Sequence, residues 1–308
     1  MILSCGEALI DFVPSENLQY TPRPGGSPYN FAIAVSRLGV PAGFLGKISE
    51  DFFGDMLLEN LASENVDISF VKRSKRLSTL AFVKLQENAE PRYAFYCENT
   101  ADRNLAEVDI PVLLPAEVKC VEFGSISLLL EPAAGAIKSF VKREAGKRAI
   151  AFDPNIRPLL ITDKKKYIKE VEELAGLSTI VKVSSEDLNW LYPERDIDEI
   201  VSDWLAEGAG TVVVTLGEKG AFLKTASFSV NVPGINVDVS DTIGAGDTFH
   251  AAFLAKAYSL GILDKNFAEN IDKDTAEEIL GFAVKAAGIN CSRVGADPPA
   301  LEDMERFS

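Results

Sequence analysis

The chain has 308 residues, of which 47% are hydrophobic and 25% charged, as in an ordinary globular protein with a sizeable core. Its formal net charge of −15 at pH 7 excludes the broad basic field that binding to nucleic acid or to an acidic membrane needs. The acidity does not exclude a phosphorylated small molecule, because a phosphate site can be built locally.

The apolar run at the start, MILSCGEALIDF, is too short for a signal peptide and contains two acidic residues. No stretch approaches the length of a membrane span. The four cysteines have neither the spacing of a redox pair nor that of a zinc knuckle. These features predict a cytoplasmic protein whose cysteines are small buried side chains.

The N-terminal part of the chain is predicted to be rich in strands. The run ILSCGEALIDFV reads as a pair of buried strands, and NLQYTP as a short extended piece. Residues 27–38 carry apolar side chains at helical spacing, with Ser27 as the expected cap and Pro28 in the first turn. A strand is expected at AGFLGKI and a helix over residues 51–65.

The rest of the chain has two different patterns. Over residues 70–95 a hydrophobic period of two predicts antiparallel strands. After residue 120, strands at CVEFGS, RAIAFDPN, TIVKVS and TVVVTLG alternate with helices near residues 131–145, 164–174, 186–192 and 197–208. This alternation predicts a parallel sheet with helices on both faces, and the earlier segment would form a small sheet at one edge, placed to act as a lid. No linker divides the chain, so we expect one domain over residues 1–308.

Two common nucleotide-binding fingerprints are excluded. After Gly244 and Gly246, the dinucleotide fingerprint requires glycine or alanine where Phe249 stands. The run GFLGK ends like a Walker A loop, but Pro41 and Ile48 occupy two positions that this loop requires to be glycine and Ser or Thr. Any phosphate chemistry therefore needs another device.

The segment DTIGAGDTFHAAFLAKAY offers such a device. It predicts a helix that begins after three small residues, so the N–H groups of Gly244, Ala245 and Gly246 would favour a phosphate oxygen. Asp247 could take the proton of an attacking hydroxyl while these amides stabilise the charge on phosphorus. The four residues alone favour a plainer interpretation, a glycine turn followed by an acid that stabilises the helix.

The longer string DTIGAGDTFHAA resembles, throughout, the C-terminal signature of the PfkB carbohydrate kinases, the ribokinase-like sugar kinases. The string GGSPYNFAIAVSRLG resembles their N-terminal signature, and similar segments from GEALIDF to the terminal GADPP extend the resemblance over essentially the whole chain. Ser49 departs from the glycine that is usual in the family. Within the family, the chain is most similar to bacterial fructokinases.

The resemblance implies a three-layer αβα core with a parallel-rich sheet and an antiparallel lid formed near residues 14–24 and 70–104. It implies transfer of the γ-phosphoryl group of ATP to a hydroxyl of a small sugar, with D-fructose expected. Alternatives of the same fold are ketodeoxygluconate kinase, ribokinase and nucleoside kinase. An alternative of another class is a non-catalytic sugar sensor, against which the complete DTIGAGD motif argues.

The resemblance also assigns roles to individual residues. It makes Asp247 the catalytic base and Gly244, Ala245 and Gly246 the anion hole. Sugar contacts are expected from Asp11, Gly25, Gly26, Asn30 and Arg157, and ATP contacts from Lys182, Ser184, Asp187, Thr215, Gly217, Gly220 and Asn290. Mg²⁺ would bridge the ATP phosphates, and Asp241 and Ile243 occupy a loop that binds K⁺ in many relatives.

Two departures from the family pattern bear on the substrate. Many relatives have the motif N-x-x-E where this chain has Ser184 and Asp187, so Asp187 would replace the glutamate that organises magnesium. Plant-type fructokinases and ketodeoxygluconate kinases commonly carry FYR in the lid, whereas this chain has Cys97 in place of the arginine. That loss weakens the case for a sugar acid, whose carboxylate prefers a bidentate cation, although Arg92, Arg103 and Arg157 remain.

Two further expectations concern packing. His250, the one histidine of the sequence, is expected to pack against a helix, because Asp247 already fills the role of base. The exposed edge of a lid favours a homodimer through the lid, with a monomer left open.

Overall fold

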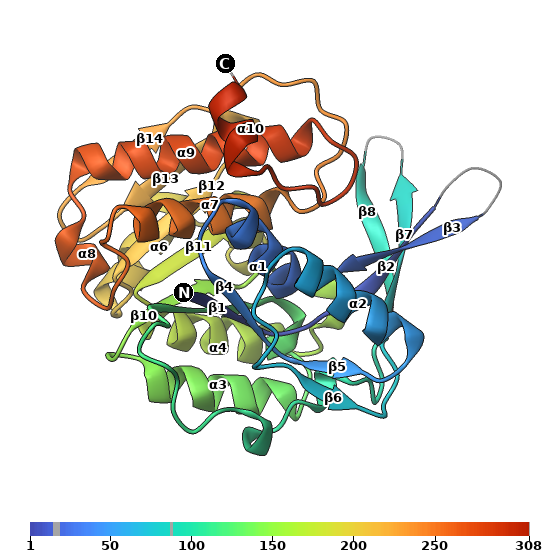
Figure 1. Ribbon diagram of the computed structural model, residues 1–308. Helices are drawn as coiled ribbons and strands as arrows, with labels where there is room; N and C mark the ends of the chain where they lie inside the picture. The colour runs from blue at the N-terminus through green and yellow to red at the C-terminus, as the bar shows by residue number, and fades with distance from the viewer. Residues whose placement is uncertain (15–18, 87–88, 308) are drawn as a thin grey trace.

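The computed structural model describes residues 1–14, 19–86 and 89–307, and within 84–86 and 89–93 it describes only the backbone. Figure 1 shows a large central sheet between two layers of helices, with a small sheet projecting from one side. In the described residues, no helix combines the length and the apolar character that crossing a bilayer requires.

The central sheet has eight strands in the order β14-β13-β12-β11-β10-β9-β1-β4. All neighbours from β4 to β12 pair in parallel, and β13 and β14 are added antiparallel at one edge. The parallel strands read as continuous apolar runs such as TVVVT because helices cover both faces. The strands are β1 (Ile2–Cys5), β4 (Ala42–Leu45), β9 (Cys120–Gly124), β10 (Ala149–Asp153), β11 (Ile180–Ser184), β12 (Thr211–Thr215), β13 (Ala221–Lys224) and β14 (Ser229–Val232).

Each face of the central sheet has its own hydrophobic core. One core lies under the helices α1 (Ser27–Arg37), α2 (Phe52–Ser63), α7 (Ala245–Ser259), α8 (Phe267–Asn270), α9 (Lys273–Cys291) and α10 (Leu301–Arg306). The other lies under α3 (Ala133–Glu144), α4 (Lys164–Gly176), α5 (Ser185–Leu191) and α6 (Ile197–Ala206). Helix α7 packs between α1 and α9, which brings the N-terminal and C-terminal parts of the chain together. The predicted three-layer αβα architecture is confirmed.

The small sheet has the strand order β3-β2-β7-β8. Its strands are β2 (Leu9–Pro14), β3 (Tyr20–Gly25), β7 (Thr79–Gln86) and β8 (Ala89–Tyr96). Two antiparallel hairpins, β2–β3 and β7–β8, meet through a parallel pairing of β2 with β7. The predicted small sheet is therefore present, although residues 15–18 and 87–88 of its predicted segments lie outside the described residues.

One predicted strand is divided into two, and another pairs with a different strand from the one expected. The run AGFLGKI divides at Gly46 into β4 of the central sheet and β5 (Lys47–Ser49), because the backbone passes so close to Gly6 that a Cβ at Gly46 would lie 2.7 Å from the Gly6 carbonyl oxygen. The strand β6 (Lys72–Ser74), expected in the small sheet, instead pairs in parallel with β5. A period of two identifies a strand but not its partner.

Candidate active site

A cavity of about 250 Å³ lies where the small sheet meets the carboxyl edge of the central sheet. Ligands of open α/β sheets bind outside the carboxyl ends of the strands, so the cavity occupies the expected place. The walls come from β2, α1 and β8, from the 3₁₀ turn η4 (Ser125–Leu128), from the loop after β10 and from the start of α7. The predicted site residues that line it are Asp11, Gly26, Asn30, Arg157, Ile243, Gly244, Gly246 and Asp247.

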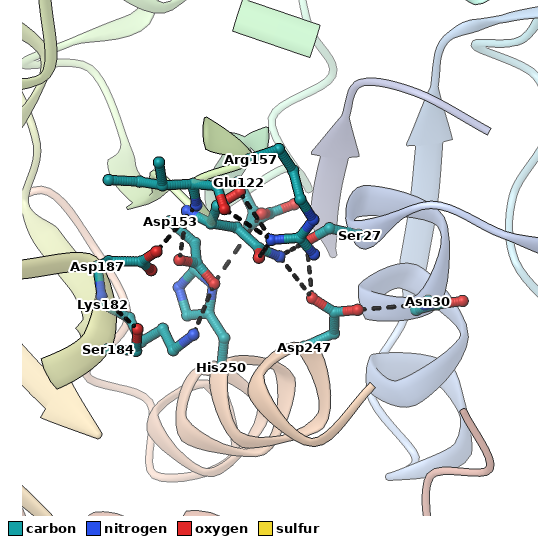
Figure 2. Close-up of polar contacts among 12 residues, drawn as sticks. Ser27, Asn30, Glu122, Asp153, Arg157, Lys182, Ser184, Asp187, Asp247 and His250 are labelled. Carbon is teal, nitrogen blue, oxygen red and sulfur yellow. Dashed lines mark hydrogen bonds and ion pairs between the residues drawn. The ribbon is translucent and has the colours of Figure 1, made fainter. Parts of the chain in front are cut away.

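Asp247 stands in the first turn of α7 with 8% of its surface exposed. Its Oδ1 accepts hydrogen bonds from Ser27 Oγ at 2.7 Å and Asn155 Nδ2 at 3.1 Å, and its Oδ2 accepts one from Asn30 Nδ2 at 3.1 Å (Figure 2). Burial raises the pKa of Asp247 against the lowering effect of the Ser27 hydrogen bond. A carboxylate whose pKa is raised toward neutrality is suited to accept a proton.

The loop before α7 differs in one point from the predicted anion hole. Gly244 is the N-cap of the helix in the left-handed conformation, with φ 74°, and has no side chain that could cap the free amides. Gly244 and Gly246 line the cavity, whereas the amide of Ala245 donates to the Thr242 carbonyl oxygen at 3.2 Å. The turn thus uses one of the three predicted amides to close itself.

Asp241 and Asn290 hold this loop from behind. Asp241 accepts from the amides of Ile243 at 3.0 Å and Gly295 at 2.9 Å. Asn290 is fully buried; its Nδ2 donates to the Ile243 carbonyl at 2.9 Å, and its Oδ1 accepts from Thr248 Oγ1 at 3.3 Å. Asn290 was expected to contact the nucleotide, but both ends of its amide are engaged inside the protein, because a buried amide must be satisfied there.

Asp11 and the glycine pair shape the sugar side of the cavity. A Cβ at Gly25 would collide with the carboxylate of Asp11. Gly26 has φ 108°, and a Cβ added there would lie 2.8 Å from the Glu7 carbonyl oxygen. Burial raises the pKa of Asp11 to about 7, against the opposing charge of Arg157. The glycines thus leave room for a carboxyl group that changes charge near neutral pH.

The sequence analysis gave no role in the site to three polar residues that line the cavity: Glu7, Ser27 and Asn155. Ser27 was expected to cap α1, but the cap is Gly26, and the Ser27 hydroxyl turns toward Asp247. The carboxylate of Glu7 replaces the missing cap, since Oε1 accepts from the Ser27 amide at 3.3 Å and Oε2 from the Ser127 amide at 3.2 Å. The strings GEALIDF and FDPN were signals that polar residues follow strand ends at this edge.

The residues expected on the nucleotide side form a buried cluster beside the cavity. Lys182 Nζ lies 2.8 Å from Asp153 Oδ2, and a Cβ at Gly246 would lie 3.1 Å from this Nζ, so the ammonium group sits directly beneath the loop. Burial lowers the pKa of Lys182, but the charge and hydrogen bond of Asp153, together with the charges of Asp187 and Asp247, outweigh burial and the net pKa is raised. Lys182 therefore acts on the loop as a fixed positive charge rather than as a group that reaches the surface.

Ser184 and Asp187 stand at the start of α5. Ser184 Oγ caps the helix by accepting from the Asp187 amide at 3.0 Å, and Asp187 Oδ1 accepts from the Ile156 amide at 3.1 Å. Burial, with the nearby charge of Asp153, raises the pKa of Asp187 to about 6. The remaining predicted residues, Thr215, Gly217 and Gly220, surround the turn that follows β12 and lie outside the cavity.

Comparison with known proteins identifies the family of the chain. Residues 1–304 match the pfkB family carbohydrate kinases. A fructokinase of Rhizobium leguminosarum bv. trifolii is 42% identical over 277 residues, which cover 89% of this chain and 84% of that protein. Probable fructokinase-2 of Arabidopsis thaliana is 35% identical over 320 residues, which cover 100% of this chain and 95% of that protein.

Two solved structures have the same fold. A fructokinase from Xylella fastidiosa with bound ATP superposes with a TM-score of 0.90 at 26% identity, covering 99% of this chain and 96% of that one. A fructokinase from Vibrio cholerae O395 with fructose, ADP and calcium superposes with a TM-score of 0.86 at 26% identity, covering 99% and 98%. The chain therefore belongs to the PfkB family of carbohydrate kinases, with a ribokinase-like fold.

Proposed function

We propose that the protein is a fructokinase, which transfers the γ-phosphoryl group of ATP to a hydroxymethyl group of D-fructose. The observation that carries this proposal is the placement of Asp247, a buried carboxylate at the N-terminus of α7, in a cavity that Asp11 and Asn30 also line. The similar fructokinases named above, with ATP or with fructose and ADP bound, support the choice of substrate.

Asp247 is proposed to take the proton of the sugar hydroxyl while the hydroxyl oxygen attacks the γ-phosphorus. A new O–P bond forms, the bond from the γ-phosphorus to the bridging oxygen breaks, and ADP leaves with that electron pair. The amides of Gly244 and Gly246, at the positive end of the α7 dipole and above the charge of Lys182, would stabilise the transferring group. Phosphoryl transfer depends on this kind of positioning and charge stabilisation.

The charges of the cavity favour a neutral sugar over a sugar acid. Of the side chains that the structure describes, three carboxyl groups line it, those of Glu7, Asp11 and Asp247, against the one guanidinium of Arg157. Arg157 Nη1 already donates to Asn155 Oδ1 at 2.6 Å. A substrate carboxylate would lie among acidic groups there, with one partly engaged cation in place of the free bidentate partner that it prefers. Arg103 instead donates to the Glu131 carbonyl at 3.2 Å, and the side chain of Arg92 lies outside the described residues.

Mg²⁺ is proposed to accompany ATP. Among the described residues, no group of three His, Cys, Asp or Glu side chains could hold a metal alone, which fits an ion bound chiefly through substrate phosphates. Asp187 offers the nearby carboxylate, and the ion would neutralise phosphate charge during transfer. A K⁺ site at the loop of Asp241 and Ile243 is a further proposal, supported by a fructokinase structure from Vibrio cholerae O395 that holds potassium.

We propose that residues 1–308 form one domain in which the small sheet is a lid, and that two lids meet in a homodimer. Alternation along β2 puts Asp11 on the cavity face and Phe12 on the opposite face. On that outer face Phe12 stacks on Phe82 at 4.7 Å between ring centroids, and Tyr20 and Tyr96 flank Phe82 at 5.4 and 5.5 Å. Phe53 of α2 packs edge-on against Phe12 at 5.7 Å, but Tyr20 and Tyr96 are 42% and 65% exposed, so the part of this aromatic surface that they form is open for a second copy of the chain.

A cytoplasmic location is also proposed, because ATP is supplied there. The cysteines Cys5, Cys97, Cys120 and Cys291 are free thiols, as a reducing compartment would keep them.

The variant Asp247→Asn tests the proposed mechanism. We expect turnover of fructose and ATP to fall by at least about 10³-fold, because the amide cannot accept the proton, while both substrates still bind. ADP release measures turnover, and calorimetry measures binding. The same assay with fructose, ribose, adenosine and ketodeoxygluconate tests the substrate. Retention of most turnover by the variant would rule out Asp247 as the base, and sugar binding without ADP release by the wild type would indicate a sensor.

A further inference from the structure

The catalytic carboxylate is held asymmetrically. Among the described residues, Oδ1 of Asp247 accepts two hydrogen bonds, from Ser27 and Asn155, whereas Oδ2 accepts one, from Asn30. The contacts with Ser27 and Asn30 are drawn in Figure 2. Each carboxylate oxygen offers about two acceptor sites. The two sites of Oδ1 are thus filled by protein, and a site remains on Oδ2.

We propose that Ser27 and Asn155 are positioning residues that hold Oδ1 of Asp247, so that Oδ2 receives the proton of the sugar hydroxyl. This inference rests on the proposed role of Asp247 as the base. It adds two positioning residues to the proposed site, and it names the carboxylate oxygen that accepts the proton.

The direction of each hydrogen bond follows from the chain of contacts behind it. Arg157 Nη1 donates to Asn155 Oδ1 at 2.6 Å, so the amide oxygen faces the guanidinium and Nδ2 faces the other way. Nδ2 donates to Ser27 Oγ at 2.7 Å and to Asp247 Oδ1. Since the Ser27 oxygen accepts from the amide, its own proton is free to be donated to Asp247 at 2.7 Å.

The backbone supports the same arrangement. Asn155 has φ 39°, in the left-handed region that asparagine tolerates better than most residues. The backbone N–H of Asn155 donates to Asp153 Oδ1 at 3.2 Å, which fixes the loop after β10. Glu7 fixes the other partner by accepting from the amide of Ser27. Both donors are therefore held before a sugar arrives.

The charged groups around Asp247 make these donors matter for its protonation. Asp153 on β10 raises the pKa of Asp247 and Lys182 on β11 lowers it, while Glu122 on β9 and Asp11 on β2 are nearby carboxyl groups whose own pKa values are raised by burial. Hydrogen bonds to the ionised form oppose the effect of burial and of these acids. Removal of one donor should therefore make Asp247 more basic and shift the acid limb of its activity to higher pH.

The test compares Ser27→Ala with Ser36→Ala. Both serines lie on α1, but Ser36 Oγ donates to the Glu64 carbonyl at 2.6 Å and has no contact with Asp247. We expect Ser27→Ala to shift the acid limb of kcat/KM for fructose upward by about one pH unit, the size of a lost hydrogen bond to a charged group. Ser36→Ala should retain the wild-type profile, and Ser27→Thr, which keeps the hydroxyl, should restore it.

The pH at which the acid limb of kcat/KM falls does not depend on how much of the enzyme is folded. A loss of stability would therefore not produce the same change in this pH. Coincident profiles for Ser27→Ala, Ser36→Ala and wild type would overturn the inference. If Asp247→Asn were inactive in the same experiment, the proposed base would stand and only this inference would fail. If Asp247→Asn kept its turnover, the proposed function itself would fail.

A double-mutant cycle and a crystal structure complete the test. Ser27→Ala and Asn155→Ala should shift the limb less than additively when combined, because both donors act on one oxygen. In a crystal with fructose, the reacting hydroxyl should lie within about 3 Å of Oδ2 with Ser27 still on Oδ1. A hydroxyl on Oδ1, or strictly additive shifts, would contradict the proposal.

Discussion

Asp11 carries a carboxyl group whose pKa is raised by burial to about 7, although Arg157 opposes the shift. The unfolded chain gives up this proton near pH 4, whereas the folded chain retains it until about pH 7. Between these values the free energy of unfolding therefore falls as pH rises. At pH 8 the folded protein carries a poorly solvated carboxylate, which a polyhydroxy ligand can satisfy with hydrogen bonds.

The variant Asp11→Asn should separate stability from binding. At pH 8 it should raise the free energy of unfolding of the ligand-free protein by roughly 2–4 kcal/mol, and this gain should vanish near pH 4. Its KM for fructose should rise, since the amide has one acceptor oxygen where the carboxylate has two. Urea unfolding at both pH values measures the first effect, with exposed Asp238→Asn as control. A gain that is equal at both pH values would contradict the assigned pKa.

His250 is a buried residue behind the cavity. It is 1% exposed, its ring lies 5.2 Å from that of Phe31, and burial lowers its pKa to about 4. Its Nδ1 stands 4.0 Å from Glu122 Oε1, behind the site. A neutral ring packed between α7 and α1 agrees with the expected packing role. The proximity of His250 to Glu122 could not be predicted from the sequence, because the two residues are distant in the chain.

At the scale of elements, the N-terminus of α1 depends on a residue from another segment. Gly26 has no side chain to cap the helix, and the Glu7 carboxylate bonds the Ser27 amide and the amide of Ser127 instead. A negative group at this end also complements the helix dipole. Glu7 thus joins α1 to η4 at the floor of the cavity.

The pair Glu7→Ala and Glu7→Gln tests this joint. Alanine leaves buried amide donors without an acceptor and should lower the free energy of unfolding by about 1–3 kcal/mol. It should also raise the KM for fructose, because α1 carries Ser27 and Asn30. Glutamine keeps one carbonyl acceptor, and burial already raises the pKa of Glu7, so this variant should stay closer to wild type. Equal losses in thermal unfolding for both variants would show that the acceptor is unimportant.

Local elements were predictable from the sequence where a single pattern governs them. Helices α1 and α4 and strands β9 to β12 were found because apolar period and turn residues are local signals. Pairing was not predictable in the same way. The parallel pairing of β2 with β7 joins Leu9 to Thr79, and that of β5 with β6 joins Lys47 to Lys72, so neither pairing leaves a pattern in a short stretch of sequence.

At the scale of the whole molecule, the site joins parts that are distant in the chain. Ser27 and Asp247 are 220 residues apart, and Asn155 and Asp247 are 92 apart. Asp247 and the glycines before it could be predicted because their chemistry lies in consecutive residues. Ser27 and Asn155 could not, because a hydroxyl or an amide becomes part of the site only when the fold aims it.

The aromatic surface of the lid predicts a change of assembly. Tyr96→Glu places a charge on this surface and should convert the proposed dimer to a monomer in sedimentation experiments at micromolar concentration, since charge is costly in the core of an interface. Val108→Glu is the matched control, because Val108 is 90% exposed in the 3₁₀ turn Glu107–Asp109, outside the small sheet. A wild-type monomer, or a Tyr96→Glu dimer as strong as wild type, would contradict the proposed interface.

The packing of α1 against α7 has a consequence for synthesis on the ribosome. Helix α1 is made early, but its partner emerges only after residue 245, so Phe31 and the first turn of α1 lack their final cover for most of translation. Contacts between such distant segments form late, and the nascent chain remains open to chaperones in the meantime. The contact that completes the candidate active site is thus also among the last that the growing chain can make.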